Sequence, residues 1–264
     1  MFDYSQISRV AAQDKDIIAI VDDLFRLARE HYPILSRLSV VLCNENRASN
    51  YFVSDTLCQE AEHRYIEQEL KPESALSRMA ESLDTRIIHD LTTISPTKQI
   101  SHLLDLGHQS SYTTPIHHQE SNLGFVFINA SSAGFFANQT IQCDIAYLTQ
   151  VISSLFVQWF ERQRHFQSSL AIALNMGHAR DPETKEHLIR MGKYSEHIAR
   201  TLSHSKEEIT HQFIHRIRLY APFHDIGKYR IPDKVLFSSA RFNEEERAVM
   251  DNHTLYGEEM INNV

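Results

Sequence analysis

The sequence lacks the long apolar runs, paired cysteines and basic leader that mark several classes of protein. No uninterrupted apolar stretch reaches the ~18 residues that a membrane span requires. Residues 1–5 contain no basic region followed by an apolar segment, so no secretory signal is visible. Cys43, Cys58 and Cys143 form neither a CxxC pair nor an even disulfide framework. We therefore expect a cytoplasmic protein with reduced thiols and no membrane span.

Basic clusters are also missing. Residues 1–150 contain 11 basic and 19 acidic side chains, whereas residues 151–264 contain 15 of each, and the net charge is −8. Proteins that bind nucleic acid neutralise phosphates with clustered Lys and Arg, and neither part of this chain has a basic run. We therefore expect no nucleic-acid partner. The 264 residues leave room for two domains of ~100–150 residues each.

Hydrophobic periodicity predicts a mixed first part and a helical second part. Apolar residues at spacings of three and four predict a helix over residues 14–31, which Pro33 ends. A later helix is expected to stop at Gly107. Short apolar or alternating runs predict five strands. The first two and the last two are predicted to pair as hairpins, and the strands lie at residues 38–43, 51–53, 85–89, 111–116 and 123–129.

This order of helices and strands resembles a GAF domain over roughly residues 14–160. The resemblance implies an antiparallel sheet with helices that senses a small molecule or supports dimerisation, and nothing in the sequence names the ligand. His117 and His118 are adjacent, and neighbouring strand side chains point to opposite faces. A solvated hairpin turn is therefore favoured over a metal site at these two histidines.

A long helix is predicted from about Asn138 onward. It contains a line of apolar residues with the heptad spacing of a coiled coil, namely Ile141, Ile145, Leu148, Ile152, Leu155 and Trp159. The preferred interpretation is a parallel homodimer joined along this line. The alternative is one broad face that is buried within a single chain.

The most informative stretch runs from Ala221 to Asp233 and reads APFHDIGKYRIPD. It places His224 beside Asp225, with Lys228 three residues further on. Neutral imidazole and carboxylate suit a first-row divalent metal ion, and a carboxylate can bridge two such ions. A bare His-Asp pair carries little weight in a chain with 16 histidines. The surrounding residues make this stretch resemble the HD superfamily of metal-dependent phosphohydrolases, and more closely its HD-GYP branch.

Two further segments match the HD-GYP pattern. Glu183 and His187 are four residues apart, which places them on one face of a helix, although on spacing alone a surface pair is commoner. Asn243 and Glu246 form a capping-box pattern that predicts the start of a helix containing His253. The resemblance implies a set of metal ligands and two catalytic residues, Asp225 and Lys228; the ligands are Glu183, His187, His224, Asp225 and His253.

The resemblance implies an α+β protein in which a GAF-like domain at residues 1–160 is joined by a long helix to an all-helical domain at residues 161–264. The second domain would hydrolyse cyclic di-GMP in signal transduction with two or three divalent metal ions. Iron or manganese is favoured, and zinc and nickel stay open. A metal-activated water would attack phosphorus, while Lys228 would neutralise the phosphate or position the nucleophile.

The family's HHE segment, GYP loop and final metal-binding aspartate do not occur before Val264. We therefore expect a fragment that holds the first half of the HD-GYP domain and is inactive by itself. Two alternatives stay open. One is a catalytically incomplete sensor or interaction protein, and the other is an HD phosphohydrolase that acts on another nucleotide.

Overall fold

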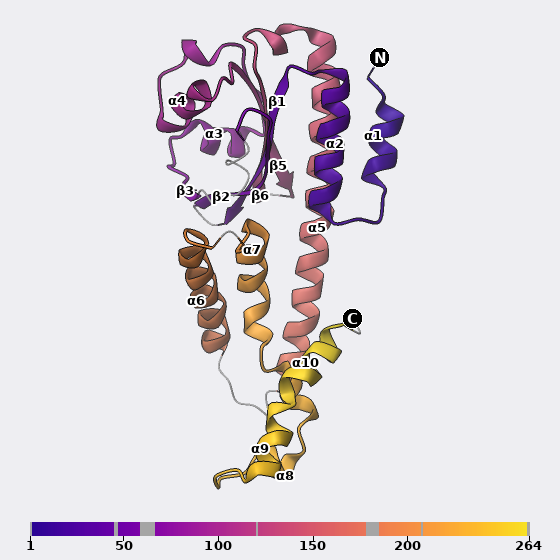
Figure 1. The fold of residues 1–264 in the computed structure, drawn as a ribbon, viewed down its shortest axis with the longest axis vertical. Coiled ribbons are helices and arrows are strands. Elements are labelled where there is room, and N and C mark those ends of the chain that lie inside the picture. Colours follow the sequence, from indigo (N-terminus) through magenta and orange to yellow (C-terminus); the bar gives the residue numbers. More distant parts are fainter. Residues whose placement is uncertain are drawn as a thin grey trace. The chain divides into compact units, whose positions relative to one another are not determined.

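The chain forms two compact units, Met1–Glu161 and Arg162–Val264. The first unit combines an antiparallel sheet with helices, and the second is helical (Figure 1). This confirms the predicted α+β class. The structure, a computed structural model, describes residues 2–44, 47–58, 67–119, 121–177, 185–206 and 208–262.

The sheet of the first unit has six strands in the order β3-β2-β1-β6-β5-β4, and all neighbours are antiparallel. Strands from the two predicted hairpins therefore meet at its centre, where β1 pairs with β6. All five predicted strands are present, with somewhat different ends, and β3 was missed. The strands are β1 Leu35–Asn44, β2 Arg47–Asp55, β3 Glu67–Glu69, β4 Arg86–Ile88, β5 Ser110–His118 and β6 Ser121–Ala130.

The main core lies between this sheet and three helices, α1 (Tyr4–Ala11), α2 (Ile17–His31) and the first part of α5 (Gln139–Gly177). Asp16 caps α2 by accepting a hydrogen bond from the amide of Ile18. Each large apolar side chain buried in such a core stabilises the fold by about 1.5–3 kcal/mol. Fully buried members of this core include Val21, Leu24, Leu38, Val40, Val126 and Ile128.

The opposite side of the sheet carries the smaller helices α3 (Ala75–Ser82) and α4 (Lys98–Asp105) (Figure 1). A separate small core packs beneath α4 and contains Ile88, Leu91 and Leu103. The chain leaves α4 through Gly107, whose φ of 97° lies in the left-handed region that glycine adopts without strain. The predicted glycine stop of this helix is therefore correct.

The apolar line on α5 is buried by its own chain. Ile145, Leu148 and Ile152 are 0% exposed and belong to the same core as α2 and the sheet. A dimer seam requires these side chains to be exposed in the single chain. The predicted seam is therefore wrong at these three residues, which follow the alternative of one broad face buried within a single chain, and the homodimer itself stays a prediction. The physical reason is that α5 uses its heptad face to cover the sheet.

The same helix is apolar over a long stretch. Gln139–Ser169 is long and apolar enough to cross a membrane by length and composition alone, although no uninterrupted apolar run in the sequence has that length. Core helices of soluble proteins pass the same test. Phe156, like the three residues above, is fully buried in the core of the first unit, so packing against the sheet accounts for part of this apolar character.

Across its described residues the second unit contains helices and no strand. The capping box of Asn243 and Glu246 is present and opens α9. However, α9 ends at Asp251, and His253 is the first residue of a new helix rather than part of the predicted one. The helices are α6 Lys185–Ser203, α7 His211–Tyr220, α8 Asp233–Leu236, α9 Glu244–Asp251 and α10 His253–Asn262, with short 3₁₀ turns η4 Ala221–Phe223 and η5 Ile226–Arg230.

Candidate metal centre

His224 and Asp225 lie between the two 3₁₀ turns that follow α7. Pro222 stands at the beginning of η4, and the pair is flanked by the buried side chains of Phe223 and Ile226. These two apolar side chains belong to a local core with residues of α5, η5 and α10. Burial of the flanking residues fixes the backbone on both sides of the pair. The His-Asp motif is thereby held on a rigid segment, as a metal site requires.

Asp225 is the centre of a group of basic side chains. Its Oδ2 lies 2.6 Å from Nζ of Lys228 and 3.3 Å from Nε2 of His224. Its Oδ1 lies 3.3 Å from Nε2 of His253. The two oxygens of one carboxylate thus face two different imidazoles. This arrangement brings together four of the residues that the sequence analysis proposed for the site.

The carboxyl group of Asp225 is held in its ionised form. Its partial burial alone would raise the pKa, because burial disfavours the charged state. The hydrogen bond from Lys228, and the positive charges that Lys228, His224 and His253 can present, outweigh burial and lower the pKa below its usual value. An ionised carboxylate is the form in which aspartate binds a metal ion.

Both histidines present Nε2 to this carboxylate because their other ring nitrogen is engaged. Nδ1 of His224 lies 3.1 Å from the carbonyl oxygen of Ala221, and Nδ1 of His253 lies 2.8 Å from that of Met250. A carbonyl only accepts, so Nδ1 donates in both contacts. In a neutral imidazole, Nε2 then carries a lone pair. Backbone carbonyls orient metal-binding histidines in the same way.

The orientation of these two imidazole rings bears on whether the residues suit a metal ion. A lone pair on Nε2 and a carboxylate oxygen are both acceptors, so they cannot hydrogen-bond to each other across 3.3 Å. Only a cation, either a proton on the ring or a metal ion, makes such an arrangement favourable. Two imidazole nitrogens and one carboxylate are ligands that first-row divalent metals accept. These types of side chain therefore suit a divalent metal ion, although their present arrangement is not a finished metal site.

His187 lies on α6 at the edge of this group. Its ring centroid is 6.3 Å from that of His224. The helix is held beside α7 by Glu196, whose carboxylate is 3.0 Å from Nη1 of Arg218 and also contacts Arg200. His187 is thus near His224 of the Asp225 group, and its role as a ligand stays a prediction.

The remaining predicted ligand, Glu183, lies outside the described residues. Within the described ranges, no three histidine, cysteine or carboxylate side chains already form a cluster that could hold a metal ion. In this structure Lys228 forms an ion pair with the carboxylate that such a cluster would need. The assignment of the complete ligand set therefore also stays a prediction.

Gly227, which belongs to the stretch of residues 221–233, brings His253 to the site. A β-carbon on Gly227 would lie 2.4 Å from the amide nitrogen of Gly257, so η5 and α10 meet backbone to backbone. Arg230 of η5 strengthens this contact by pairing with Glu259 and stacking on Tyr256, with its guanidinium carbon 4.6 Å from the ring centroid. A contact between distant segments leaves no periodic signal in the sequence.

A second polar cluster, also missed, lies in the core of the first unit. His108 is 0% exposed and bridges Oδ2 of Asp55, 3.0 Å from its Nε2, and Oγ of Ser36, 2.8 Å from its Nδ1. Arg37 approaches the same carboxylate at 3.5 Å. Asp55 also accepts from the backbone amide of Leu57, at 2.9 Å. Because the cluster is closed to solvent and satisfied internally, its role is structural.

The comparisons with known proteins agree with the HD motifs. Residues 184–264 match the family profile described as HD domain. The chain is 33% identical over 119 residues to a cyclic di-GMP phosphodiesterase of Thermotoga maritima, covering 42% of this chain and 31% of that protein. It is 37% identical over 101 residues to the cyclic di-GMP phosphodiesterase response regulator RpfG of Xanthomonas campestris, covering 38% and 25%.

A third relative is named for a different cyclic dinucleotide. The chain is 31% identical over 109 residues to the 3'3'-cGAMP-specific phosphodiesterase 2 of Vibrio cholerae, covering 41% of this chain and 19% of that protein. The matched segments thus span less than a third of the length of each relative. These matches confirm that the second unit contains an HD-type domain.

Solved structures similar to the first unit include GAF domains. The A. aeolicus nlh2 GAF domain matches with a TM-score of 0.47 and 11% identity, covering 59% of this chain and 93% of that chain. A phycocyanobilin-bound GAF domain from a cyanobacterial phytochrome matches with a TM-score of 0.47 and 12% identity, covering 60% and 96%. The first unit itself has a six-stranded antiparallel sheet packed against α2 and α5, which is the antiparallel sheet with helices that the sequence predicted.

Proposed function

We propose that the second unit supplies the metal-dependent phosphodiesterase site of a signalling protein, and that its substrate is a cyclic dinucleotide, cyclic di-GMP in the first place. The observation that carries the proposal is the pair of histidine Nε2 atoms that face the ionised carboxylate of Asp225. The substrate class is supported by the names of the curated relatives reported above.

In this proposal His224, Asp225 and His253 hold divalent metal ions, with Glu183 and His187 as further ligands. The bound ions would supply an activated water and positive charge for the phosphate oxygens. Asp225 is suited to the central position because each of its oxygens faces a different imidazole. The carbonyls of Ala221 and Met250 hold the Nδ1 protons and thereby keep both Nε2 lone pairs available for binding.

Lys228 supplies a positive charge from the protein itself, in addition to the charge of the proposed metal ions. Its ammonium group lies 2.6 Å from Asp225 and is partly exposed, so it can reach an anion that approaches the carboxylate. We assign to it the neutralisation of a non-bridging phosphate oxygen. Because the carboxylate and the ammonium are three residues apart on one short turn, this charge stays beside the ligands.

A second candidate function is a sensor or interaction protein that does not hydrolyse its ligand. Two observations favour it. The described side chains form no finished metal cluster, and Lys228 occupies the carboxylate of Asp225. A third possibility, hydrolysis of another nucleotide, is favoured by the relative named for 3'3'-cGAMP.

The deciding experiment is an anaerobic hydrolysis assay with added Mn²⁺ or Fe²⁺ on the full-length gene product and on residues 1–264 alone. Cyclic di-GMP and 3'3'-cGAMP are offered separately, and the linear dinucleotide product is measured. We expect product from the full-length protein, and the assay of residues 1–264 alone tests whether these residues suffice for turnover.

The Asp225→Ala variant of the full-length protein is the matched control, and it should lose the activity. Metal-loaded full-length protein that binds either dinucleotide without cleaving it would support the second candidate. Turnover that Asp225→Ala leaves unchanged would show that the active site has been assigned incorrectly.

A further inference from the structure

Lys228 and His224 face the same oxygen of Asp225. Nζ of Lys228 lies 2.6 Å from Oδ2, and Nε2 of His224 lies 3.3 Å from it. The other oxygen, Oδ1, faces Nε2 of His253 at 3.3 Å. The ammonium group of Lys228 therefore pairs with the oxygen that a metal ion on the His224 side of the carboxylate would need.

The backbone keeps Lys228 beside this carboxylate. The amide of Lys228 donates to the carbonyl oxygen of Asp225 at 2.9 Å, and the amide of Ile231 donates to the carbonyl oxygen of Lys228 at 3.0 Å. In a 3₁₀ turn, side chains three residues apart lie above one another. The turn is also fixed from outside, because Gly227 meets the backbone of α10 at His253. The backbone of Lys228 thus stays in place, whatever its ammonium group binds.

The side chain of Lys228 can change its partner without a movement of this backbone. The side chains of Lys228 and Asp225 are 21% and 17% exposed, so their ion pair lies at the edge of the site. A lysine ammonium is a compact charge on a flexible four-carbon stem. An anion that approaches from solvent can therefore take the ammonium group as its partner. The carboxylate and such an anion are alternative partners of one cation.

The ion pair with Lys228 opposes a second cation at the same carboxylate. The ammonium group neutralises the single negative charge of Asp225 and repels any further positive charge beside Oδ2. This repulsion is stronger in a partly buried site than in bulk water, because the effective dielectric constant is lower. Lys228 therefore lowers the affinity of the Asp225 group for a divalent ion, and an anion that draws the ammonium group away reduces this effect.

We propose that Lys228 makes metal binding at Asp225 depend on a phosphodiester anion. Its ammonium group opposes a divalent ion while it pairs with the carboxylate, and opposes it less when a phosphate oxygen is its partner. The inference rests on the proposed function, in which Asp225 holds a metal ion. Coupling between two ligands is reciprocal, so the anion and the metal raise each other's affinity by the same factor. The site would then hold its metal most tightly when substrate is present.

Two simpler roles of Lys228 predict different results. If the ion pair only stabilised the turn η5, removal of the lysine would loosen the His-Asp segment and weaken metal binding. If Lys228 only contacted substrate, its removal would leave the metal affinity in the absence of an anion unchanged. The proposed exchange of partners predicts tighter metal binding without the anion and a smaller response to it. The direction of the change in metal affinity therefore separates the three roles.

The test measures the Mn²⁺ affinity of the full-length protein from the electron paramagnetic resonance signal of unbound Mn²⁺, at constant ionic strength. Sodium dimethyl phosphate, a simple phosphodiester, replaces sodium chloride in a second series. Lys228→Met removes the charge and should tighten Mn²⁺ binding in chloride by at least about fivefold, the lower end of coupling between two ligands. Dimethyl phosphate should tighten Mn²⁺ binding more in the wild type than in Lys228→Met. Lys228→Arg keeps the charge and should bind Mn²⁺ in chloride like the wild type.

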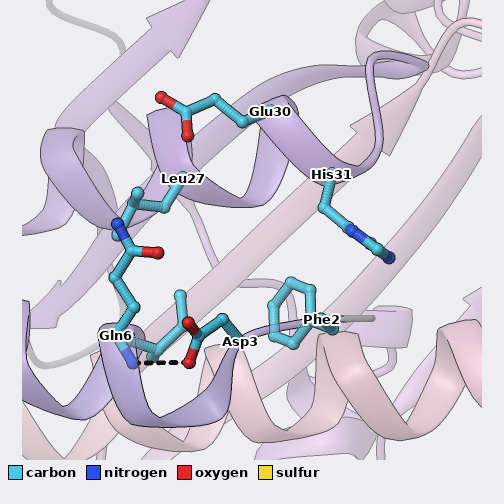
Figure 2. A pocket seen from close by; sticks show the side chains of 7 residues that line it. Phe2, Asp3, Gln6, Leu27, Glu30 and His31 are labelled. Atoms are coloured by element: carbon cyan, nitrogen blue, oxygen red, sulfur yellow. Dashed lines mark hydrogen bonds between the residues drawn. The ribbon is translucent and has the colours of Figure 1, made fainter.

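Two variants control for general effects of charge. Lys234→Met removes an exposed cation from α8 of the same unit and should change nothing. Glu30→Gln removes an exposed carboxylate that lines a pocket of the first unit, apart from Asp3 (Figure 2), and should also leave Mn²⁺ binding unchanged. Equal tightening by Lys234→Met would mean that net charge alone sets the affinity, and it would overturn the proposal. Unchanged or weaker Mn²⁺ binding by Lys228→Met would overturn it as well.

Asp225→Ala separates this inference from the proposed function. Mn²⁺ binding that Asp225→Ala leaves unchanged would contradict the metal centre itself. Loss of Mn²⁺ binding in Asp225→Ala, together with wild-type affinity in Lys228→Met, would support the metal centre and overturn only the role of Lys228. Circular dichroism that matches the wild type verifies the folding of each variant.

Discussion

A β-carbon added to Gly227 would lie 1.8 Å from the carbonyl oxygen of His253. The turn that follows the His-Asp pair and the first residue of α10 are therefore in direct backbone contact. This contact sets how far Nε2 of His253 lies from the carboxylate of Asp225, which is 3.3 Å. The glycine in the HDIGK motif thus acts as a positioning residue for a ligand from a different helix.

Replacing Gly227 by alanine should displace α10 and weaken metal binding. We expect a loss of about 10–100-fold in affinity for Mn²⁺, comparable to the loss of a group that orients a metal ligand. Isothermal titration calorimetry under anaerobic conditions measures this affinity. Gly257→Ala is the matched control, because its β-carbon would meet Gly227 only at the ordinary contact distance of 3.5 Å.

The control should keep wild-type metal affinity. Since Gly257 lies inside α10, alanine there should also favour the helix by about 1 kcal/mol. If both glycine variants bind Mn²⁺ like the wild type, the close contact at Gly227 does not control the position of His253.

Asp225→Ala and Lys228→Ala should separate metal binding from the handling of phosphate. Asp225→Ala deletes the carboxylate that faces both imidazoles, so the metal content after reconstitution should fall strongly. Lys228→Ala deletes only the ammonium ion that pairs with this carboxylate, so metal content should be unchanged or higher. Elemental analysis of both desalted variants tests this difference. Equal metal loss in both would contradict the assigned roles.

Asp55→Asn should reveal the contribution of the buried cluster around His108. The variant keeps a side-chain oxygen for the backbone amides but loses the charge that faces His108 and Arg37. We expect the free energy of unfolding at pH 7 to fall by about 1.5–3 kcal/mol, the value of hydrogen bonds to charged groups. Urea denaturation followed by circular dichroism measures the change.

The difference in the free energy of unfolding between the wild type and Asp55→Asn should also depend on pH. Burial opposes ionisation of Asp55, but the hydrogen bonds from His108 and Leu57 and the charge of Arg37 lower its pKa in the folded state. A pKa that is lower in the folded state stabilises the fold at pH values above the unfolded-state pKa of about 3.9. This stabilisation is lost as the pH falls through the folded-state pKa. The difference should therefore narrow below about pH 4, and a constant difference down to pH 2 would disprove the charge effect.

Leu148→Ala should destabilise the first unit rather than dissociate a dimer. The side chain is fully buried in the core, so its truncation should cost about 2–5 kcal/mol of unfolding free energy. Gln150→Ala, at an exposed position of the same helix, is the control and should have little effect. Chemical denaturation and light scattering of both variants check the prediction. If Leu148→Ala halved the molar mass and left the stability unchanged, this result would support the predicted dimer seam.

The sequence alone was sufficient for features that depend on neighbours along the chain. Short apolar or alternating runs predicted five strands of the sheet and missed β3, and the glycine at 107 predicted the end of α4. The adjacency of His224 and Asp225, with Lys228 one short turn later, places these side chains together whatever the rest of the chain does. Short-range spacing determines such features because the backbone has few conformations over three or four residues.

The tertiary structure decided what these features contact. A heptad line has the same spacing whether it faces a second chain or its own sheet, so the burial of Leu148 could not be read from its period. Ser36, Asp55 and His108 come from separate segments and meet only because the sheet brings those segments together. His253 reaches Asp225 because Gly227 lets two backbones touch. Long-range contacts depend on how whole elements pack, and that information is not contained in the local spacing of residues.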